Sequence, residues 1–392
     1  MAIQQRIASI DVFRALTMFL MIFVNDLWTL VDIPRWLGHT EANEDGMGLS
    51  DVVFPAFLFI VGLSIPIALS NRIKREQSYL EIIWHILSRS FALIMMGFFM
   101  VNLENINGAL LPIPRQYWQL SMALAIFLIW SDYRKPDGPS TSTVITLKSV
   151  GVLILAALAW IYAGGSAENP TWMKPHWWGI LGLIGWSYLV TALVYLLVRN
   201  RIWLLAIVFV IFNALNLLEV LDLQKVPSLQ LVVSASNYAC TMGGVLVSVI
   251  MFRLNKNQRG GFILIILPLM AALLITYGFY IRPWGGISKI LATPSWTAVC
   301  TGISIAALAA IHLLADVWKL RGIFTPIRAA GTSTLTCYLV PYFYYPLLSL
   351  SGLYLPIVLR TGAVGIIKSL LFALLIIQIT GILERLNVRL KI

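Results

Sequence analysis

Charged residues are scarce in this sequence. Asp, Glu, Lys and Arg make up 11% of its 392 residues, whereas about 25% is usual in soluble domains. The three cysteines, Cys240, Cys300 and Cys337, lie in apolar segments without a Cys-x-x-Cys spacing, which predicts buried free thiols and no disulfide or cysteine metal site. The sequence also lacks the G-x-x-x-x-G-K-[ST] and G-x-G-x-x-G patterns, which argues against a nucleotide-driven motor.

Apolar residues are abundant instead. They form 59% of the chain, and the mean hydropathy is +0.85. Apolar stretches of roughly 20 residues, the length that a helix needs to cross a membrane, recur along the chain. We therefore predict an all-α, polytopic bundle of about 12 transmembrane helices (10–12) that forms one domain over residues 1–392. The expected spans are Ile10–Leu30, Val52–Ser70, Ile82–Val101, Trp118–Trp130, Val144–Ala163, Trp177–Val198, Ile202–Leu221, Leu229–Phe252, Phe262–Ile281, Trp296–Trp318, Thr332–Leu350 and Thr361–Leu383.

The connections between these spans alternate in charge. Basic clusters such as 72–75, 253–259 and 385–391 fall at every second connection, whereas the loop 31–50 carries four acidic residues against one arginine. The positive-inside rule then places both termini in the cytoplasm and gives an even number of crossings. The net charge of +11 is explained by contact with anionic lipid, so we expect the lipid bilayer as a partner and no nucleic acid.

Chemically reactive side chains concentrate around the segment "GHTEANEDGMGLSDVVFPAFLFIVG" (residues 38–62). Asn25 ends the first span, His39 lies in the following loop, and Asp51 opens the second span. A neutral imidazole can act as a general base, a carboxylate can fix its tautomer, and an amide N–H can stabilise an oxyanion. The alternatives are structural: Asp51 as a helix cap, His39 as a solvated loop residue and Asn25 as the partner of a helix end.

The other histidines favour simpler interpretations. His85 and Arg89 are four residues apart and could meet an anionic cofactor or lipid phosphate. His176 lies among tryptophans that are typical of an aromatic belt. His312 and Asp316 are also four residues apart, which favours a structural polar pair.

Four motifs carry a resemblance to a known family. They are "RIASIDVFRALTMFLMIFVND" (6–26), "LSDVVFPAFLFIVG" (49–62), "ISKILATPSW" (287–296) and "GTSTLTCYLVPY" (331–342). The sequence resembles the heparan-alpha-glucosaminide N-acetyltransferase family, whose bacterial members belong to a broader group of transmembrane acyltransferases. It departs from the family pattern at Ala15 and Ser333, in a longer loop between His39 and Asp51, and in an additional helix pair over 177–221.

The resemblance implies transfer of acetyl from acetyl-CoA to the amine of a glucosamine-like sugar. It places the family's active-site histidine on His39, its asparagine on Asn25 and its carboxylate on Asp51, and it matches Lys289 to the lysine of the family's K-x-L block. Two routes are open: direct transfer of the acetyl group with His39 as general base, and transfer through an acetyl-histidine.

Acetyl-CoA is anionic and cytoplasmic, so basic residues near the inner connections are candidates to bind it. These cofactor-binding candidates are Arg14, Arg72, Arg89 and Arg328. The resemblance adds Lys289, and no metal is expected. Because an extended CoA is shorter than the ~30 Å hydrocarbon core, we expect the glycine-containing loop 38–48 to fold into the bundle as a re-entrant segment.

The expected partners are an amino-sugar or glycan acceptor and the bilayer of a bacterial cytoplasmic membrane, with a homodimer left open. Two other functions compete with N-acetyl transfer. One is O-acylation of an envelope polysaccharide; the other is secondary transport of a sugar-like solute, since 12 spans with both ends inside also describe carriers.

Overall fold

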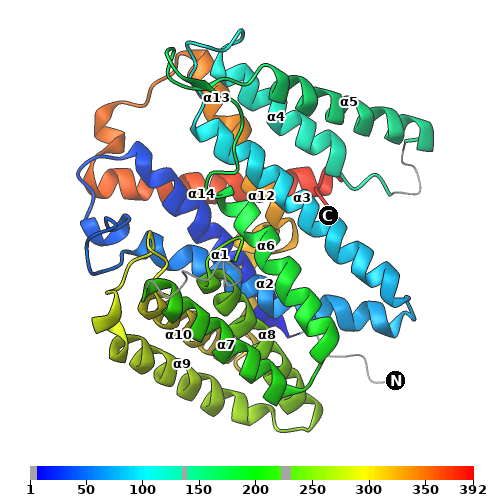
Figure 1. Ribbon diagram of the computed structural model, residues 1–392, viewed down its shortest axis with the longest axis vertical. Coiled ribbons are helices and arrows are strands. Elements are labelled where there is room, and N and C mark those ends of the chain that lie inside the picture. Colours follow the sequence, from blue (N-terminus) through cyan, green and yellow to red (C-terminus); the bar gives the residue numbers. More distant parts are fainter. Residues whose placement is uncertain (1–6, 135–138, 222–230) are drawn as a thin grey trace.

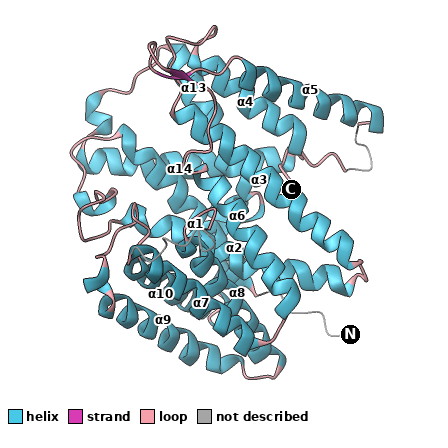
Figure 2. Ribbon diagram, in the orientation of Figure 1, coloured by secondary structure: helices cyan, strands magenta, loops and turns pink. Residues whose placement is uncertain are grey.

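The computed structural model describes residues 7–134, 139–221 and 231–392, and this part of the chain is a bundle of helices with one two-stranded hairpin (Figures 1 and 2). The first helices are α1 (Ala8–Asp26), α2 (Leu49–Lys74), α3 (Tyr79–Glu104), α4 (Arg115–Trp130) and α5 (Thr141–Trp160). The antiparallel strands β1 (Gly164–Gly165) and β2 (Pro170–Thr171) follow. The remaining helices are α6 (Gly179–Val198), α7 (Ile202–Val220), α8 (Ala235–Lys256), α9 (Ile263–Tyr280), α10 (Pro294–His312), α11 (Arg328–Thr332), α12 (Thr334–Leu339), α13 (Pro341–Ser351) and α14 (Gly362–Arg385).

Ten helices in the described ranges are long and apolar enough to cross a membrane, which confirms an all-α, multi-pass membrane protein. Two of the predicted spans are not among these ten helices. Helix α4 has only 16 residues, and the expected span 332–350 is divided among α11, α12 and α13. Pro341 begins α13, and a proline has no backbone N–H to continue the preceding helical ladder. The first residues of the predicted span Leu229–Phe252 lie outside the described residues.

Contacts between distant connections show which ends of α1, α4 and α14 lie together. Val31, after α1, forms a bridge with Thr361, before α14. Ser131, after α4, forms a bridge with Leu390, after α14. The two ends of α14 therefore mark opposite ends of the bundle, and α1 and α4 finish at different ends. The end of the bundle at which α14 finishes is assigned to the cytoplasm only by the Lys/Arg distribution, so its orientation stays a prediction.

Helix α2 runs through the middle of the bundle. It packs against α1, α6, α8 and α10, and its Gly62 lies so close to α8 that a Cβ there would overlap the carbonyl of Thr241. By contrast, the spans of α5, α7 and α9 are only 17%, 22% and 22% buried, so their apolar side chains face the surroundings, as expected for lipid-facing helices. Asp51 thus begins a helix that is held from several sides.

Candidate active site

Asp51 organises the loop in front of α2. Its side chain is fully buried, and its Oδ2 atom accepts hydrogen bonds from the backbone N–H of Gly48 (2.9 Å), the backbone N–H of Thr40 (3.1 Å) and the Thr40 hydroxyl (3.1 Å). Gly48 immediately precedes the helix, so the carboxylate satisfies a donor at its N-terminus from within the first turn. The capping interpretation of Asp51 is therefore part of its role.

The other carboxylate oxygen of Asp51 holds His39. The Nδ1 atom of His39 lies 2.6 Å from Oδ1 of Asp51, and the His39 side chain is 52% exposed. A carboxylate accepts only from a protonated nitrogen, so this contact favours the tautomer with hydrogen on Nδ1 and leaves Nε2 as the basic nitrogen. The predicted pairing of His39 with Asp51 is present in the structure.

Lys289 completes the cluster from a connection far away in the sequence. Its Nζ atom lies 3.1 Å from Nδ1 and 3.4 Å from Nε2 of His39, and 3.9 Å from Oδ1 of Asp51. Burial lowers the pKa of Lys289 from its usual value, and the negative charge of Asp51 partly opposes this shift. We expected Lys289 among the cofactor-binding residues, but the structure places it beside His39.

The neighbouring helices fix both sides of this cluster. The indole N–H of Trp296, in α10, donates to the backbone carbonyl of Asp51 at 3.1 Å. The amide of Asn216, in α7, donates to the carbonyl of Ala292 at 2.8 Å, close to Lys289 in the chain. These bonds tie the start of α2 to α10 and the connection before α10 to α7.

Asn25 does not join the cluster. It is exposed in the last turn of α1, and within the described residues its side chain makes no hydrogen bond. Its expected role as an oxyanion donor therefore stays a prediction that no contact with His39 supports.

The residue next to Asn25 forms a buried polar cluster that we did not predict. Asp26 is 2% exposed, and its carboxylate accepts hydrogen bonds from Lys368 (2.6 Å), Ser369 (2.6 Å) and Tyr345 (2.7 Å). Lys368 lies inside the apolar segment 361–383, and this charge could have indicated the cluster from the sequence, because an intramembrane charge usually has a partner. The cluster joins α1 to α13 and α14.

The loop 38–48 does not fold into the bundle, contrary to our expectation of a re-entrant segment. Glu41, Glu44 and Asp45 are exposed, and His39 is half exposed at the end of α2. The physical reason is the cost of burying carboxylates, since three acidic groups within five residues keep this loop in solvent.

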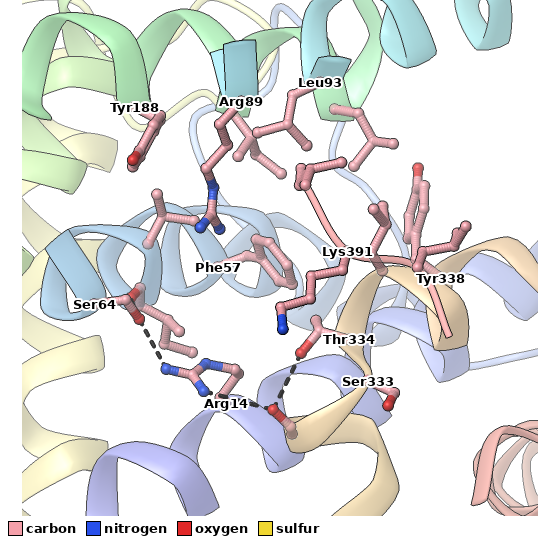
Figure 3. A pocket seen from close by; sticks show the side chains of 18 of the residues that line it. Arg14, Phe57, Ser64, Arg89, Leu93, Tyr188, Ser333, Thr334, Tyr338 and Lys391 are labelled. Atoms are coloured by element: carbon pink, nitrogen blue, oxygen red, sulfur yellow. Dashed lines mark hydrogen bonds between the residues drawn. The ribbon is translucent and has the colours of Figure 1, made fainter. Parts of the chain in front are cut away.

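A cavity of about 390 Å³ lies between α1, α2, α3, α6, the segment α11–α12 and residues 390–392. Figure 3 shows the guanidinium groups of Arg14 and Arg89 and the ammonium group of Lys391 turned toward the same space. No aspartate or glutamate occurs among the described residues that line it, and Nζ of Lys391 also pairs with Asp132, outside the lining, at 3.3 Å. Arg14 is held by Ser64 at 2.8 Å and by Asp11 at 3.3 Å.

Some buried polar atoms along this cavity have no hydrogen-bond partner among the described residues. They include Nε of Arg89, the hydroxyl of Tyr188 and the hydroxyl of Ser333, and the Arg89 guanidinium lies over the Tyr188 ring at 4.9 Å. Because buried polar groups are nearly always hydrogen-bonded, these atoms indicate a space for a polar ligand. Together with the three cations they fit an anionic one.

The cavity accounts for some of the predicted cofactor-binding residues. Arg14 and Arg89 line it, and Lys391, which we did not select, joins them. Arg72 lies one turn beyond the lining residue Ala68 and bonds Gln77 at 2.8 Å. Arg328 is exposed at the start of α11 and does not line the cavity.

The cavity extends along the helix that carries Asp51. Its α2 lining begins at Phe57 and reaches Ala68; at 1.5 Å per residue these positions lie about 9 Å and about 26 Å along the axis from Asp51. The cations Arg14 and Arg89 lie on the neighbouring helices α1 and α3. An anionic ligand held there could extend along α2 toward the level of His39.

The fold and these features define a multi-pass membrane protein with a histidine–carboxylate pair at one end of the bundle and a cation-lined cavity inside it. Residues 6–224 match the family model described as "Domain of unknown function (DUF5009)". This match covers more than half of the 392 residues, so the chain belongs to that family.

The chain is also similar to curated proteins named heparan-alpha-glucosaminide N-acetyltransferase. It is 34% identical to the Homo sapiens protein over 101 residues, which cover 26% of this chain. It is 36% identical to the Mus musculus protein over 101 residues, which cover 25% of this chain. The matched part spans only 14% of the length of either relative. This partial homology confirms the resemblance and supports an acyltransferase-like function in a membrane.

Proposed function

We propose that this protein is a membrane-embedded N-acetyltransferase that moves acetyl from acetyl-CoA to the amine of a glucosamine-like acceptor. The observation that carries the proposal is the 2.6 Å contact between Nδ1 of the half-exposed His39 and the buried carboxylate of Asp51. This arrangement directs Nδ1 to the carboxylate and leaves Nε2 of a half-exposed imidazole to act as the base. The names of the similar proteins supply the acetyl group and the amino-sugar acceptor as the chemistry to test.

The cavity supplies a binding place for the donor. The phosphates of acetyl-CoA are anionic, and Arg14, Arg89 and Lys391 present cationic donors to one space. The unpartnered Nε of Arg89 and hydroxyl of Tyr188 can each bond an oxygen or nitrogen of such a ligand. The apolar stretch of α2 toward Phe57 suits the pantetheine arm, with the thioester directed toward the end that carries His39.

His39 acts as the general base in the transfer. The ammonium group of the acceptor first releases one proton to water. The neutral nitrogen then attacks the carbonyl carbon of the thioester, a C–N bond forms, and Nε2 of His39 takes the second proton that the nitrogen loses. The C–S bond then breaks, and the imidazolium returns this proton to the departing CoA sulfur, so that the products are an acetamide and free CoA thiol. Asp51 stabilises the imidazolium and keeps Nδ1 protonated throughout.

Lys289 is the nearest cation to the reacting centre. We assign to it the stabilisation of the oxyanion that forms on the acetyl carbonyl, because its Nζ lies 3.4 Å from Nε2 of His39. The exposed acidic side chain of Glu41, two residues from His39, is suited to attract a cationic amino sugar from the same side. This preference favours an amine acceptor over the hydroxyl of a neutral polysaccharide.

The decisive experiment measures acetyl transfer by the purified protein. Wild-type protein in detergent or vesicles is supplied with acetyl-CoA and glucosamine, and CoA release and N-acetylglucosamine are followed together. His39→Ala should lower transfer by about 10²–10⁴, the usual contribution of a general base, while acetyl-CoA still raises the melting temperature. Acetyl trapped on His39 without acceptor would instead assign a two-step route through acetyl-histidine. Near wild-type transfer by a folded His39→Ala variant would exclude this site.

A further inference from the structure

The loops that carry His39 and Lys289 are joined at Asp45. The Asp45 carboxylate accepts hydrogen bonds from Nε of Arg282, at 2.9 Å and 3.1 Å to its two oxygens. Its Oδ1 atom also accepts the backbone N–H of Ile287 at 2.7 Å. Arg282 and Ile287 both belong to the connection between α9 and α10, more than 230 residues away in the sequence.

Backbone groups on both loops reinforce this contact. The N–H of Gly46 donates to the carbonyl of Ile287 at 2.9 Å, so Ile287 bonds Asp45 through its N–H and Gly46 through its carbonyl. The hydroxyl of Ser288 donates to the carbonyl of Ala42 at 3.2 Å. We call these contacts between residues 42–46 and 282–288 the loop clasp.

Gly286 permits the close approach within the loop clasp. Its φ is +69°, a conformation that side chains disfavour, and a Cβ there would come 3.2 Å from the Asp45 carboxylate. The local backbone is therefore suited to receive the carboxylate of Asp45.

We propose that Asp45 is a positioning residue for acetyl transfer, which fixes Lys289 against His39 by holding the two loops together. The inference rests on the proposed function, because it concerns the same site. Ile287 precedes Lys289 by two residues, so a shift of Ile287 moves the lysine directly. A misplacement of about 1 Å at a reacting centre can cost on the order of 10² in rate.

The effect is geometric, since the ion pair alone is weak. The side chains of Asp45 and Arg282 are 51% and 41% exposed, and exposed pairs contribute little to stability. The backbone N–H of Ile287 is the main cause that holds the pKa of Asp45 below its ordinary value, with Arg282 adding to it. The carboxylate is therefore charged across the neutral range, and the loop clasp keeps its charge-assisted bonds there.

The neighbouring residue provides a matched control. Glu44 pairs with Arg35 at 3.2 Å, but both residues lie in the loop between α1 and α2, and Arg35 is 87% exposed. Glu44→Ala removes one carboxylate from the same loop without touching the connection to Lys289.

The test compares Asp45→Ala, Asp45→Asn and Glu44→Ala in the full-length protein, with acetyl-CoA and glucosamine as substrates. We expect Asp45→Ala to lower kcat about 10- to 100-fold, with unchanged stabilisation by acetyl-CoA because the cavity lies elsewhere. Asp45→Asn keeps an acceptor for the Ile287 N–H and should fall between wild type and Asp45→Ala. Glu44→Ala should stay within about twofold of wild type.

A double substitution separates positioning from general damage to the fold. If Asp45 acts through Lys289, Asp45→Ala combined with Lys289→Met should be no slower than Lys289→Met alone. Full multiplication of the two effects, or equal rates for Asp45→Ala and Glu44→Ala, would overturn the proposal.

Hydrogen exchange distinguishes the failure of this proposal from failure of the proposed function. The amides of Ile287 and Gly46 should exchange faster in Asp45→Ala than in the wild-type protein. In Glu44→Ala they should exchange at the wild-type rate. Absence of transfer by the wild-type protein would refute the transferase assignment, whereas unchanged amide exchange in Asp45→Ala would refute the loop clasp whatever the activity.

Discussion

Asp51 binds His39 with one carboxylate oxygen and the backbone of the preceding loop with the other. The Nδ1–Oδ1 distance is 2.6 Å, and Oδ2 receives the N–H groups of Thr40 and Gly48. The same buried side chain therefore orients the imidazole and fixes the N-terminus of α2. Substitutions of His39 and Asp51 should differ for this reason.

Asp51→Asn should reduce both transfer and stability. The amide keeps an acceptor oxygen but loses the charge that strengthens its bonds to His39, Thr40 and Gly48, so we expect a loss of about 1–3 kcal/mol in the free energy of unfolding. Transfer should fall because the imidazole tautomer is no longer fixed. Melting temperature and kcat measured on the same preparations check both effects. A variant with wild-type stability and reduced transfer would mean that Asp51 does not hold the loop.

The cavity predicts which arginines bind acetyl-CoA. Arg89→Gln should raise the Kd of acetyl-CoA at least about tenfold, because a charge-assisted bond to phosphate contributes about 1.5–3 kcal/mol. Arg328→Gln is the matched control, since Arg328 is exposed and outside the cavity lining. Ligand-induced shifts of the melting temperature measure both variants. Equal weakening in the two variants would place the phosphates elsewhere.

The lowered pKa of Lys289 predicts an alkaline limit on activity. Burial favours the neutral amine, so Lys289 loses its proton at a lower pH than an exposed lysine would. Because only the ammonium form stabilises an oxyanion well, kcat should decline as pH rises through this lowered pKa, and Lys289→Met should be slow with no such decline. A pH profile of kcat for both proteins tests this. An unchanged alkaline limb in Lys289→Met would assign it to another group.

The predicted orientation is tested by labelling single cysteines in intact cells. A membrane-impermeant thiol reagent should reach cysteine at Glu44 and should not reach cysteine at Lys74 until the membrane is opened. The three natural cysteines are buried, so their background should be low. The reverse pattern would place His39 in the cytoplasm and invert the proposed topology.

Hydropathy alone determined the class and most of the elements of this protein. Long apolar runs identify spans because a helix must satisfy its backbone inside lipid, and α1, α2, α3 and α14 fall where the sequence placed them. The same reasoning could not show that 332–350 is interrupted, since hydropathy does not register a break at Ser333 or Pro341. The family motifs identified His39 and Asp51, whose pairing the structure contains.

Tertiary structure decided which distant groups meet. Lys289 and His39 are 250 residues apart, and their contact depends on how α2 and α10 pack, which no periodicity in either segment specifies. For the same reason Lys391 could not be selected from the sequence, where it is one cation in a basic tail, yet folding places it in the cavity with Arg14 and Arg89. Asn25 shows the converse: its position at the end of the first span and the family resemblance suggested a site, but its side chain is exposed in the last turn of α1. Local sequence fixes where a helix starts and ends, whereas contacts across the bundle depend on the rotation and depth of each helix, which packing alone sets.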